Sequence, residues 1–227
     1  MITRRNFLGG GFASLLAVQY SEIFERIGNG HPGEVPGDDT CVRKAIALRR
    51  TVRSFSPRML SHEQLMGVLW AAQGITDSIR GLRAVPSAGA LYPLEVCAFI
   101  GDGTVVGMKS GVHRYRPRPI DMETVDDRDL RKELARACLS QMWVAQAPMS
   151  LVVSAVYSRT TQKYGERGIR YADIEAGCAA QNVFLMAVSL GLAAGIVGAF
   201  DDKAVHELTG VGADCYPLLV MPIGYRA

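Results

Sequence analysis

The sequence predicts an α+β protein with about five strands and five or six helices and no internal repeat. Apolar, β-prone runs alternate irregularly with segments of helical period, and glycine and proline punctuate them. Hydrophobic residues make up 48% of the chain and charged residues 21%, which is ordinary globular composition. The length of 227 residues suits one compact domain with an N-terminal appendage.

The appendage has the layout of a Tat export signal. Arg4 and Arg5 precede an uncharged stretch from Phe7 to Val18, which is too short to span a bilayer as a helix. We therefore expect a signal at residues 1–18, a glycine- and proline-rich linker at 19–39 and the domain at 40–227. The expected location is periplasmic or otherwise extracytoplasmic, with membrane contact only through export or a retained signal. A basic start followed by an amphipathic helix in a cytoplasmic protein is the alternative.

The first half of the domain begins with a helix at 40–48, which Thr40 can cap. Ser61 and Gln64 have capping-box spacing, so a second helix should start there and end near Gly74. An apolar β-prone run predicts a strand at 94–100, followed by a turn.

The second half carries the longest helix, expected at 171–190. Its stretch 183–190 is apolar on nearly every side, which places it in the centre of the molecule or in a subunit interface. The other expected elements are strands at 112–115, 150–156, 194–197 and 218–223 and helices at 129–143 and 202–208.

Charge and cysteine usage exclude several classes of partner. The net charge of +3 is spread without a long basic run, so no nucleic-acid partner is expected. The five cysteines are widely separated and lack histidine at ligand spacing, so no metal site is expected. Cys97 and Cys178 lie in apolar segments where free cysteine packs as a small hydrophobic residue. Disulfides remain open for an exported protein.

A cluster of basic residues follows the first helix. Arg49, Arg50, Thr51 and Arg53 place three guanidinium groups and a hydroxyl within five residues. Like charges this close repel one another, and a bound phosphate is the usual reason for such a cluster. A solvated basic turn is the alternative.

A loop of small residues leads into the strand at 94–100. Pro86, Ser87, Ala88 and Gly89 would let backbone groups approach a flat ring closely, and Tyr92 adds an aromatic face and a phenolic proton. An ordinary turn would explain the same residues.

Two further segments have similar character. Gly198, Ala199 and Phe200 lie in the sequence GIVGAFD and present backbone with little bulk beside an aromatic ring, although a tight strand-to-helix connection would do the same. Arg226 follows PIGY at the C-terminus and could be another phosphate donor or part of a solvated tail.

Taken together, these segments resemble a known family. The segments RRTVRSF, LRAVPSAGALYPLEV, RYADIEAGCAAQN, GLAAGIVGAFDD and PLLVMPIG occur in this order between residues 49 and 224. They resemble the nitroreductase superfamily, and the PSAGALYPLE and EAGxAAQN pieces are most similar to its SagB-type dehydrogenases.

The resemblance implies a three-layer fold with a central mixed sheet covered by helices, usually a homodimer with two FMN sites at the subunit interface. Arg49, Arg50, Thr51 and Arg53 would hold the flavin phosphate, ribityl chain and pyrimidine edge, with help from Arg226. The segment 86–89 would lie along the isoalloxazine ring, contributed by the partner subunit. The backbone of 198–200 would lie near the reactive N5 side.

The implied activity is hydride or electron transfer between a donor and a small organic acceptor, in two half-reactions on the flavin. Arg50 or Arg53 would supply positive charge at the pyrimidine edge, and Tyr92 is the candidate proton donor, with a structural role as the alternative. NAD(P)H is the expected donor for a cytoplasmic protein, and a quinol or redox protein for an exported one. The competing functions are a non-catalytic flavin-binding protein and an exported anion-binding module without flavin.

The sequence departs from the SagB-type pattern at two positions. Leu91 stands where characterised azoline dehydrogenases have the lysine before Tyr92, and an aliphatic side chain cannot act as a base. We therefore do not expect azole formation. Cys178 replaces the histidine of the EAGH pattern, which removes a titratable imidazole.

Overall fold

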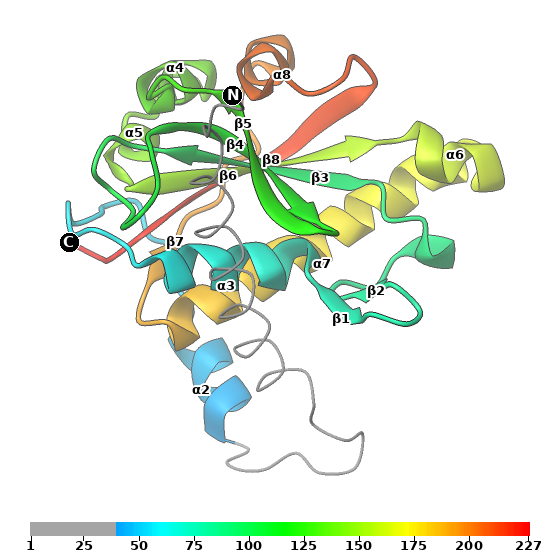
Figure 1. Cartoon of the computed structure of the whole chain (residues 1–227), viewed down its shortest axis with the longest axis horizontal. Helices are drawn as coiled ribbons and strands as arrows, with labels where there is room; N and C mark the ends of the chain where they lie inside the picture. The colour runs from blue at the N-terminus through cyan, green and yellow to red at the C-terminus, as the bar shows by residue number, and fades with distance from the viewer. Residues whose placement is uncertain (1–39) are drawn as a thin grey trace, which may run out of the picture. The chain divides into compact units, whose positions relative to one another are not determined.

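The computed structural model describes residues 40–227, with side chains from Val42 onward. These residues form one compact unit built around a six-stranded sheet with the order β5-β4-β3-β6-β8-β7 (Figure 1). The strands of this sheet are β3 Leu94–Ile100, β4 Gly111–Pro117, β5 Ile120–Asp126, β6 Met149–Val156, β7 Ala193–Ala194 and β8 Cys215–Gly224. A separate small hairpin consists of β1 Ile75–Asp77 and β2 Leu82–Arg83.

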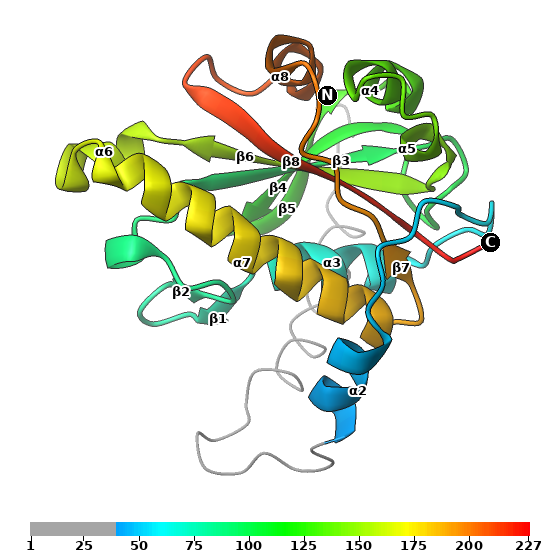
Figure 2. The same ribbon diagram turned by 180° about the vertical axis from the view of Figure 1, so that it is seen from behind.

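Helices cover both faces of the sheet. The helices are α2 Thr40–Leu48, α3 His62–Gln73, α4 Arg131–Ala137, α5 Trp143–Gln146, α6 Ser158–Tyr164, α7 Arg167–Ser189 and α8 Asp202–Thr209, with a short 3-10 turn at Ala88–Ala90. Figures 1 and 2 show α3 and α7 on one side of the sheet and α4, α5 and α8 on the other. This arrangement confirms the expected α+β fold with a helix-covered central sheet.

The sheet is mixed at one edge. Its named strands pair antiparallel, whereas Thr51 forms a parallel bridge with Ala194 of β7. Val52 donates its backbone N–H to the carbonyl of Ala194 over 2.9 Å. The segment after α2 thereby extends the sheet beyond β7, which brings residues from opposite ends of the chain together.

Helix α3 starts where the sequence predicts. The Ser61 hydroxyl accepts from the Gln64 backbone N–H at 3.1 Å, and the Gln64 side chain accepts from the Ser61 N–H at 2.9 Å. The Gly74 backbone N–H donates to Trp70 and closes the helix. Two backbone N–H groups at the start of the helix, which have no partner within the helix, thus find hydrogen-bond acceptors in side chains three residues away or less.

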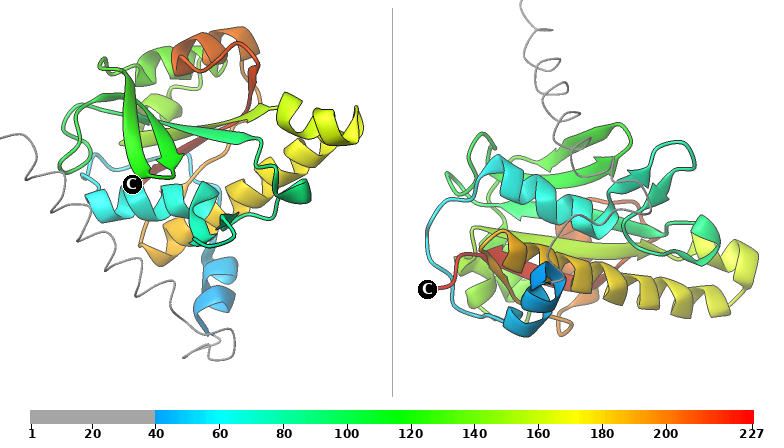
Figure 3. Two further views of the ribbon diagram at one scale, coloured as in Figure 1. Left: turned by 45° about the vertical axis from the view of Figure 1, so that its right-hand side comes forward. Right: turned by 90° about the horizontal axis from the view of Figure 1, so that it is seen from below.

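Helix α7 crosses one face of the sheet and is flanked by α2 and α3 (Figures 2 and 3). Val183, Phe184 and Ala187 are buried there, which confirms the central position expected for this apolar stretch. The helix begins at Arg167, earlier than expected, because α6 and the turn at Gly165 lead directly into it.

The prediction of a single helix at 129–143 is wrong. Helix α4 ends at Ala137, and α5 begins only at Trp143. Leu139 and Ser140 between them have φ values of 54° and 60°, a left-handed conformation that ends an α-helix. Cys138 is fully buried beneath this turn, so the break lets the chain fold back onto the core.

The expected strands differ mainly at the sheet edges. The strand expected at 194–197 is only Ala193–Ala194, with Val197 adding a single bridge to Val220, whereas β8 extends further than expected. Strand β5 was not expected, because its residues are largely exposed and lack the apolar alternation of a half-buried strand.

The proposed signal at 1–18 and linker at 19–39 lie outside the described residues. Within residues 40–227, no helix combines the length and apolarity needed to cross a membrane. Cys97 is buried, as its apolar surroundings predict, and burial raises the pKa of its thiol to about 12. Cys138, Cys178 and Cys215 are also free thiols, and Cys178 is half-buried.

Candidate functional site

The arginine segment after α2 lies between β7 and the C-terminus. Besides the bridge from Thr51 to β7, Phe55 pairs with Arg226 in an antiparallel bridge. The Ser56 backbone N–H donates to the Tyr225 carbonyl over 2.8 Å. Residues 49–53 and Arg226, which the sequence assigned to one phosphate site, therefore belong to the same edge of the sheet.

The guanidinium groups of this segment contact aromatic rings or backbone. Arg49 lies over the ring of Phe184 at 5.3 Å from its centroid, and Arg53 lies over Trp143 at 5.8 Å. Arg50 donates to the carbonyls of Ala47 and Arg49. Within residues 40–227, none of these arginines forms an ion pair with a carboxylate, so their charge is open to an external anion.

The segment after β7 joins the same region through Trp143. A side chain at Gly195 would collide with Trp143 and with the Val52 carbonyl, so only glycine allows this close approach. Gln141 links the indole N–H of Trp143 to the carbonyl of Ala199. Gly198 and Ala199 are exposed, and Phe200 packs against the core under α8.

The loop with Pro86, Ser87, Ala88 and Gly89 lies elsewhere. It sits beside the first half of α7, whereas the arginine segment lies near its end (Figure 1). Gly89 has a φ of 63°, and a side chain there would meet Tyr164 and Lys163 of α6. A single chain thus brings three of the four predicted segments together and leaves the small-residue loop apart from them.

An apolar groove of about 370 Å³ runs along the exposed side of α7. It extends from Asp173 to Phe184 and is bordered by Ile196, Leu218 and Leu219. Arg49 stacks on Phe184 at one end, and small residues of α7 (Ala176, Gly177 and Ala180) form the floor. The groove therefore follows the helix from the half beside the small-residue loop to the half beside the arginine segment.

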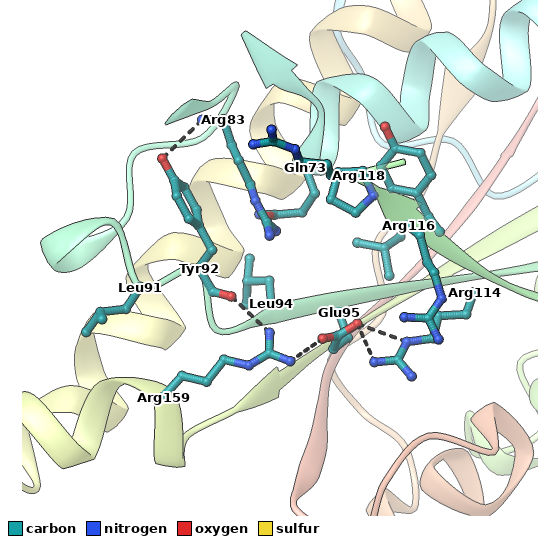
Figure 4. Close-up of a pocket in the computed structure, with 13 residues that line it drawn as sticks. Gln73, Arg83, Leu91, Tyr92, Leu94, Glu95, Arg114, Arg116, Arg118 and Arg159 are labelled. Carbon is teal, nitrogen blue, oxygen red and sulfur yellow. Dashed lines mark hydrogen bonds and ion pairs between the residues drawn. The ribbon is translucent and has the colours of Figure 1, made fainter. Parts of the chain in front are cut away.

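Tyr92 is held firmly by its neighbours. Its φ of 47° is unusual for a residue with a side chain, and its backbone N–H donates to the Ser87 hydroxyl over 2.9 Å. Its own hydroxyl accepts from the Arg83 backbone N–H at 3.0 Å, and the Arg83 guanidinium stacks on its ring at 4.5 Å (Figure 4). The phenolic proton is not used in that contact, so Tyr92 keeps a proton to donate.

Glu175 is a functional candidate that the sequence reasoning missed. It lies in α7 with only 2% of its surface exposed, and neither carboxylate oxygen has a hydrogen bond of ordinary geometry within residues 40–227. Burial raises its pKa to about 7, although Ser87, Arg83 and Gln73 oppose the shift. The sequence did contain a signal for this residue: Glu175 is a charged residue within a helical segment of mostly small residues. Burying a carboxylate in such a segment is costly, and costly buried charges often have a function.

Comparisons with known proteins identify the family of the chain. A sequence model described as the Nitroreductase family matches residues 46–225. A protein of Methanocaldococcus jannaschii named as a nitroreductase is 46% identical over 178 residues, covering 78% of this chain and 87% of the relative.

Two other proteins are similar at lower identity. The microcin B17-processing protein McbC of Escherichia coli is 27% identical over 130 residues, covering 55% of this chain and 47% of McbC, about half of each protein. The crystal structure of a nitroreductase homologue from Ralstonia eutropha superposes with a TM-score of 0.72 at 26% identity, covering 87% of this chain and 88% of that one.

Proposed function

The chain belongs to the nitroreductase family of oxidoreductases, and from this premise we propose that it uses FMN to transfer hydride or electrons between a donor and a small organic acceptor. The observation that carries the proposal is the group of arginines at the edge of β7, Arg49, Arg53 and Arg226, none of which forms an ion pair within residues 40–227. They lie in the same edge region as the exposed backbone of 198–199, at the end of the apolar groove along α7.

The residues present fit FMN chemically. Arginines without a carboxylate partner suit the phosphate, and the Thr51 hydroxyl can add a hydrogen bond. No atom of another described residue, apart from the two chain neighbours, lies within 4 Å of a Cβ built on Gly198, so the backbone there is open to a flat ring. Bound FMN would supply the hydride chemistry, while Arg50 or Arg53 would place positive charge near the pyrimidine edge and Tyr92 would hold a proton for the acceptor.

We propose a homodimer that completes the site. The small-residue loop and the arginine segment lie at different ends of α7 within one chain. If two copies pack antiparallel along the α7 groove, the partner's loop reaches the arginine segment of the first copy. The apolar floor of the groove supports such packing, because exposed apolar surface of this extent is stabilised by burial.

Within the nitroreductase family, we propose that the chain belongs to the SagB-type branch. The PSAGALYPLE and EAGxAAQN pieces and the similarity to McbC support it. Leu91 is half-buried beside Tyr92 and carries no base, so the proposed reaction does not include aromatisation of peptide azolines.

The donor depends on location. We propose Tat export through Arg4 and Arg5, with a quinol or redox protein as donor; NAD(P)H is the donor if the protein stays in the cytoplasm. Changing both arginines to lysine should retain the protein in the cytoplasm, as measured by cell fractionation with an unchanged Sec substrate as control. Normal export of the double variant would rule out the Tat route.

A flavin spectrum of the purified protein tests the central proposal. The expected protein is yellow, is bleached by dithionite and is reoxidised by a nitroaromatic or quinone. A yellow protein that cannot be reoxidised by these acceptors would instead be a flavin-binding protein without this activity. If the protein stays colourless after incubation with FMN, the oxidoreductase proposal fails, and the arginine segment would instead bind an anion other than FMN.

A further inference from the structure

A second group of arginines surrounds a cavity away from the arginine segment. The cavity measures about 410 Å³ and lies between the 83–92 loop, β3, β4 and the start of α6 (Figure 4). Among the residues that the structure describes, five arginines and one carboxylate, that of Glu95, line the cavity. The five are Arg83, Arg114, Arg116, Arg118 and Arg159. This volume lies within the range of small-molecule sites.

Glu95 orders two of these arginines but cannot neutralise the group. Its carboxylate accepts from Arg114 at 2.9–3.0 Å and from Arg159 on its other oxygen, and Figure 4 shows it between them. Arg159 also donates to the Tyr92 carbonyl over 3.0 Å. The carboxylate of Glu95 therefore orients two guanidinium groups but neutralises only one of their two positive charges.

Among the described residues, no carboxylate forms an ion pair with Arg83 or Arg118. The half-buried Arg83 donates to the Gln73 side-chain oxygen over 2.7 Å and stacks on Tyr92. Burial lowers the pKa of Arg83 and the neighbouring Arg159 lowers it further, whereas Glu95 and Glu175 oppose the shift. Within residues 40–227, the Arg118 guanidinium makes no ion pair, and Arg116 pairs only with Glu123 on the outer strand β5.

A buried hydroxyl of the cavity wall points to the same kind of ligand. Tyr115 is 3% exposed, yet its hydroxyl has no hydrogen-bond partner among the described residues. Buried donors normally have partners, and an oxyanion in the cavity would provide one. Gln73 also lines the cavity, but its side-chain oxygen accepts from Arg83 and its amide faces Glu175.

We propose that this cavity binds the anionic part of the substrate, a small organic molecule with at least two carboxylate or phosphate groups. Glu95 holds Arg114 and Arg159 in fixed directions, while Arg83 and Arg118 contribute charge that no ion pair within residues 40–227 neutralises. Tyr92 forms part of the wall, so a bound anion would lie beside the candidate proton donor. Only the identification of the occupant as substrate rests on the proposed function; anion binding does not.

Isothermal titration of the full-length protein, saturated with FMN beforehand, tests the proposal. Citrate and inorganic pyrophosphate are the probes, titrated separately, and the tighter of the two identifies carboxylate or phosphate chemistry. Arg118→Gln and Arg83→Gln should each weaken binding about tenfold or more, because each removes a charge-assisted contact. Arg80→Gln is the matched control. Arg80 lies in the β1–β2 hairpin that also contains Arg83, but it is exposed and pairs with Asp77, so its removal should leave the affinity for both probes unchanged.

The outcomes separate this proposal from the flavin proposal. Arg53→Ala should weaken FMN binding but leave citrate or pyrophosphate binding intact. If neither probe binds a yellow protein, or if Arg118→Gln and Arg80→Gln behave alike, the anion cavity is refuted while the flavin site stands. If the protein binds no FMN but binds a probe in a manner that depends on Arg118, the cavity stands and the oxidoreductase proposal fails. The exposed Arg118 keeps the test valid if Arg83→Gln does not fold.

Discussion

The molecule carries two arginine clusters that differ in how their charges are held. In the arginine segment, Arg49 and Arg53 lie over the rings of Phe184 and Trp143 and have no carboxylate partner within the described residues. In the cavity, Arg114 and Arg159 share Glu95, whose side chain is only 13% exposed.

The difference indicates two ways to prepare a site for an anion. Aromatic contacts position the arginine segment without reducing its charge, so the ligand must supply all of the neutralisation. An internal carboxylate orients the cavity arginines and compensates part of their charge, so a ligand has less charge to neutralise there, which suits reversible binding. A tightly held cofactor fits the first description, and a substrate fits the second.

Removing Glu95 should have the largest effect. Glu95→Gln leaves two half-buried guanidinium groups without their shared anion, and we expect a loss of about 3 kcal/mol in the free energy of unfolding. The measurement is urea unfolding at pH 7. Glu123→Gln is the control, because the Glu123–Arg116 pair is 46% and 45% exposed and should contribute less than about 1 kcal/mol. Equal losses would show that Glu95 is an ordinary surface partner.

Glu175 should make stability depend on pH. Its folded pKa of about 7 lies above the ordinary value of 4.5, so the folded protein binds a proton more tightly than the unfolded chain. Stability from this group is therefore complete below pH 4.5 and is lost as the pH rises toward 7.

The variant Glu175→Gln should remove this dependence. Each pKa unit corresponds to about 1.4 kcal/mol, so the variant should gain on the order of 3 kcal/mol relative to the parent at pH 8. The comparison is made by urea unfolding at pH 5 and pH 8. Burial also lowers the pKa of His62 and His113, but both proteins keep these residues, so the difference between the two proteins isolates Glu175. A parallel pH dependence in the two proteins would mean that Glu175 is ionised with a partner at all of these pH values.

The arginine segment should respond through ligand affinity and hardly through stability. Arg53→Ala removes an exposed cation, and we expect FMN affinity to fall by about 1.5 to 3 kcal/mol, that is, tenfold or more. Arg50→Ala should lower FMN affinity by a similar amount. Fluorescence titration with FMN measures the affinity of both variants. Arg128→Ala, which removes an exposed cation distant in sequence, should leave FMN affinity unchanged. Unchanged affinity in Arg53→Ala and Arg50→Ala would place the phosphate elsewhere.

Local patterns predicted much of the fold. The capping box of α3, the buried strands β3 and β6 and the apolar half of α7 were all predicted from residues close in sequence. These features depend on spacing of two to four residues, which the chain displays directly. The break between α4 and α5 was not predictable, because burial of Cys138 overrides the helical period around it.

The sequence by itself therefore determined the elements, the family segments and the arginine segment of this protein. Only the tertiary structure decided that Glu95 meets Arg159, 64 residues away, that Glu175 is buried, and that the small-residue loop lies apart from the arginine segment. An ion pair between distant residues leaves no local pattern, and the environment of a carboxylate depends on which elements pack around it. Charge in a sequence is visible, whereas its neutralisation depends on the packed fold.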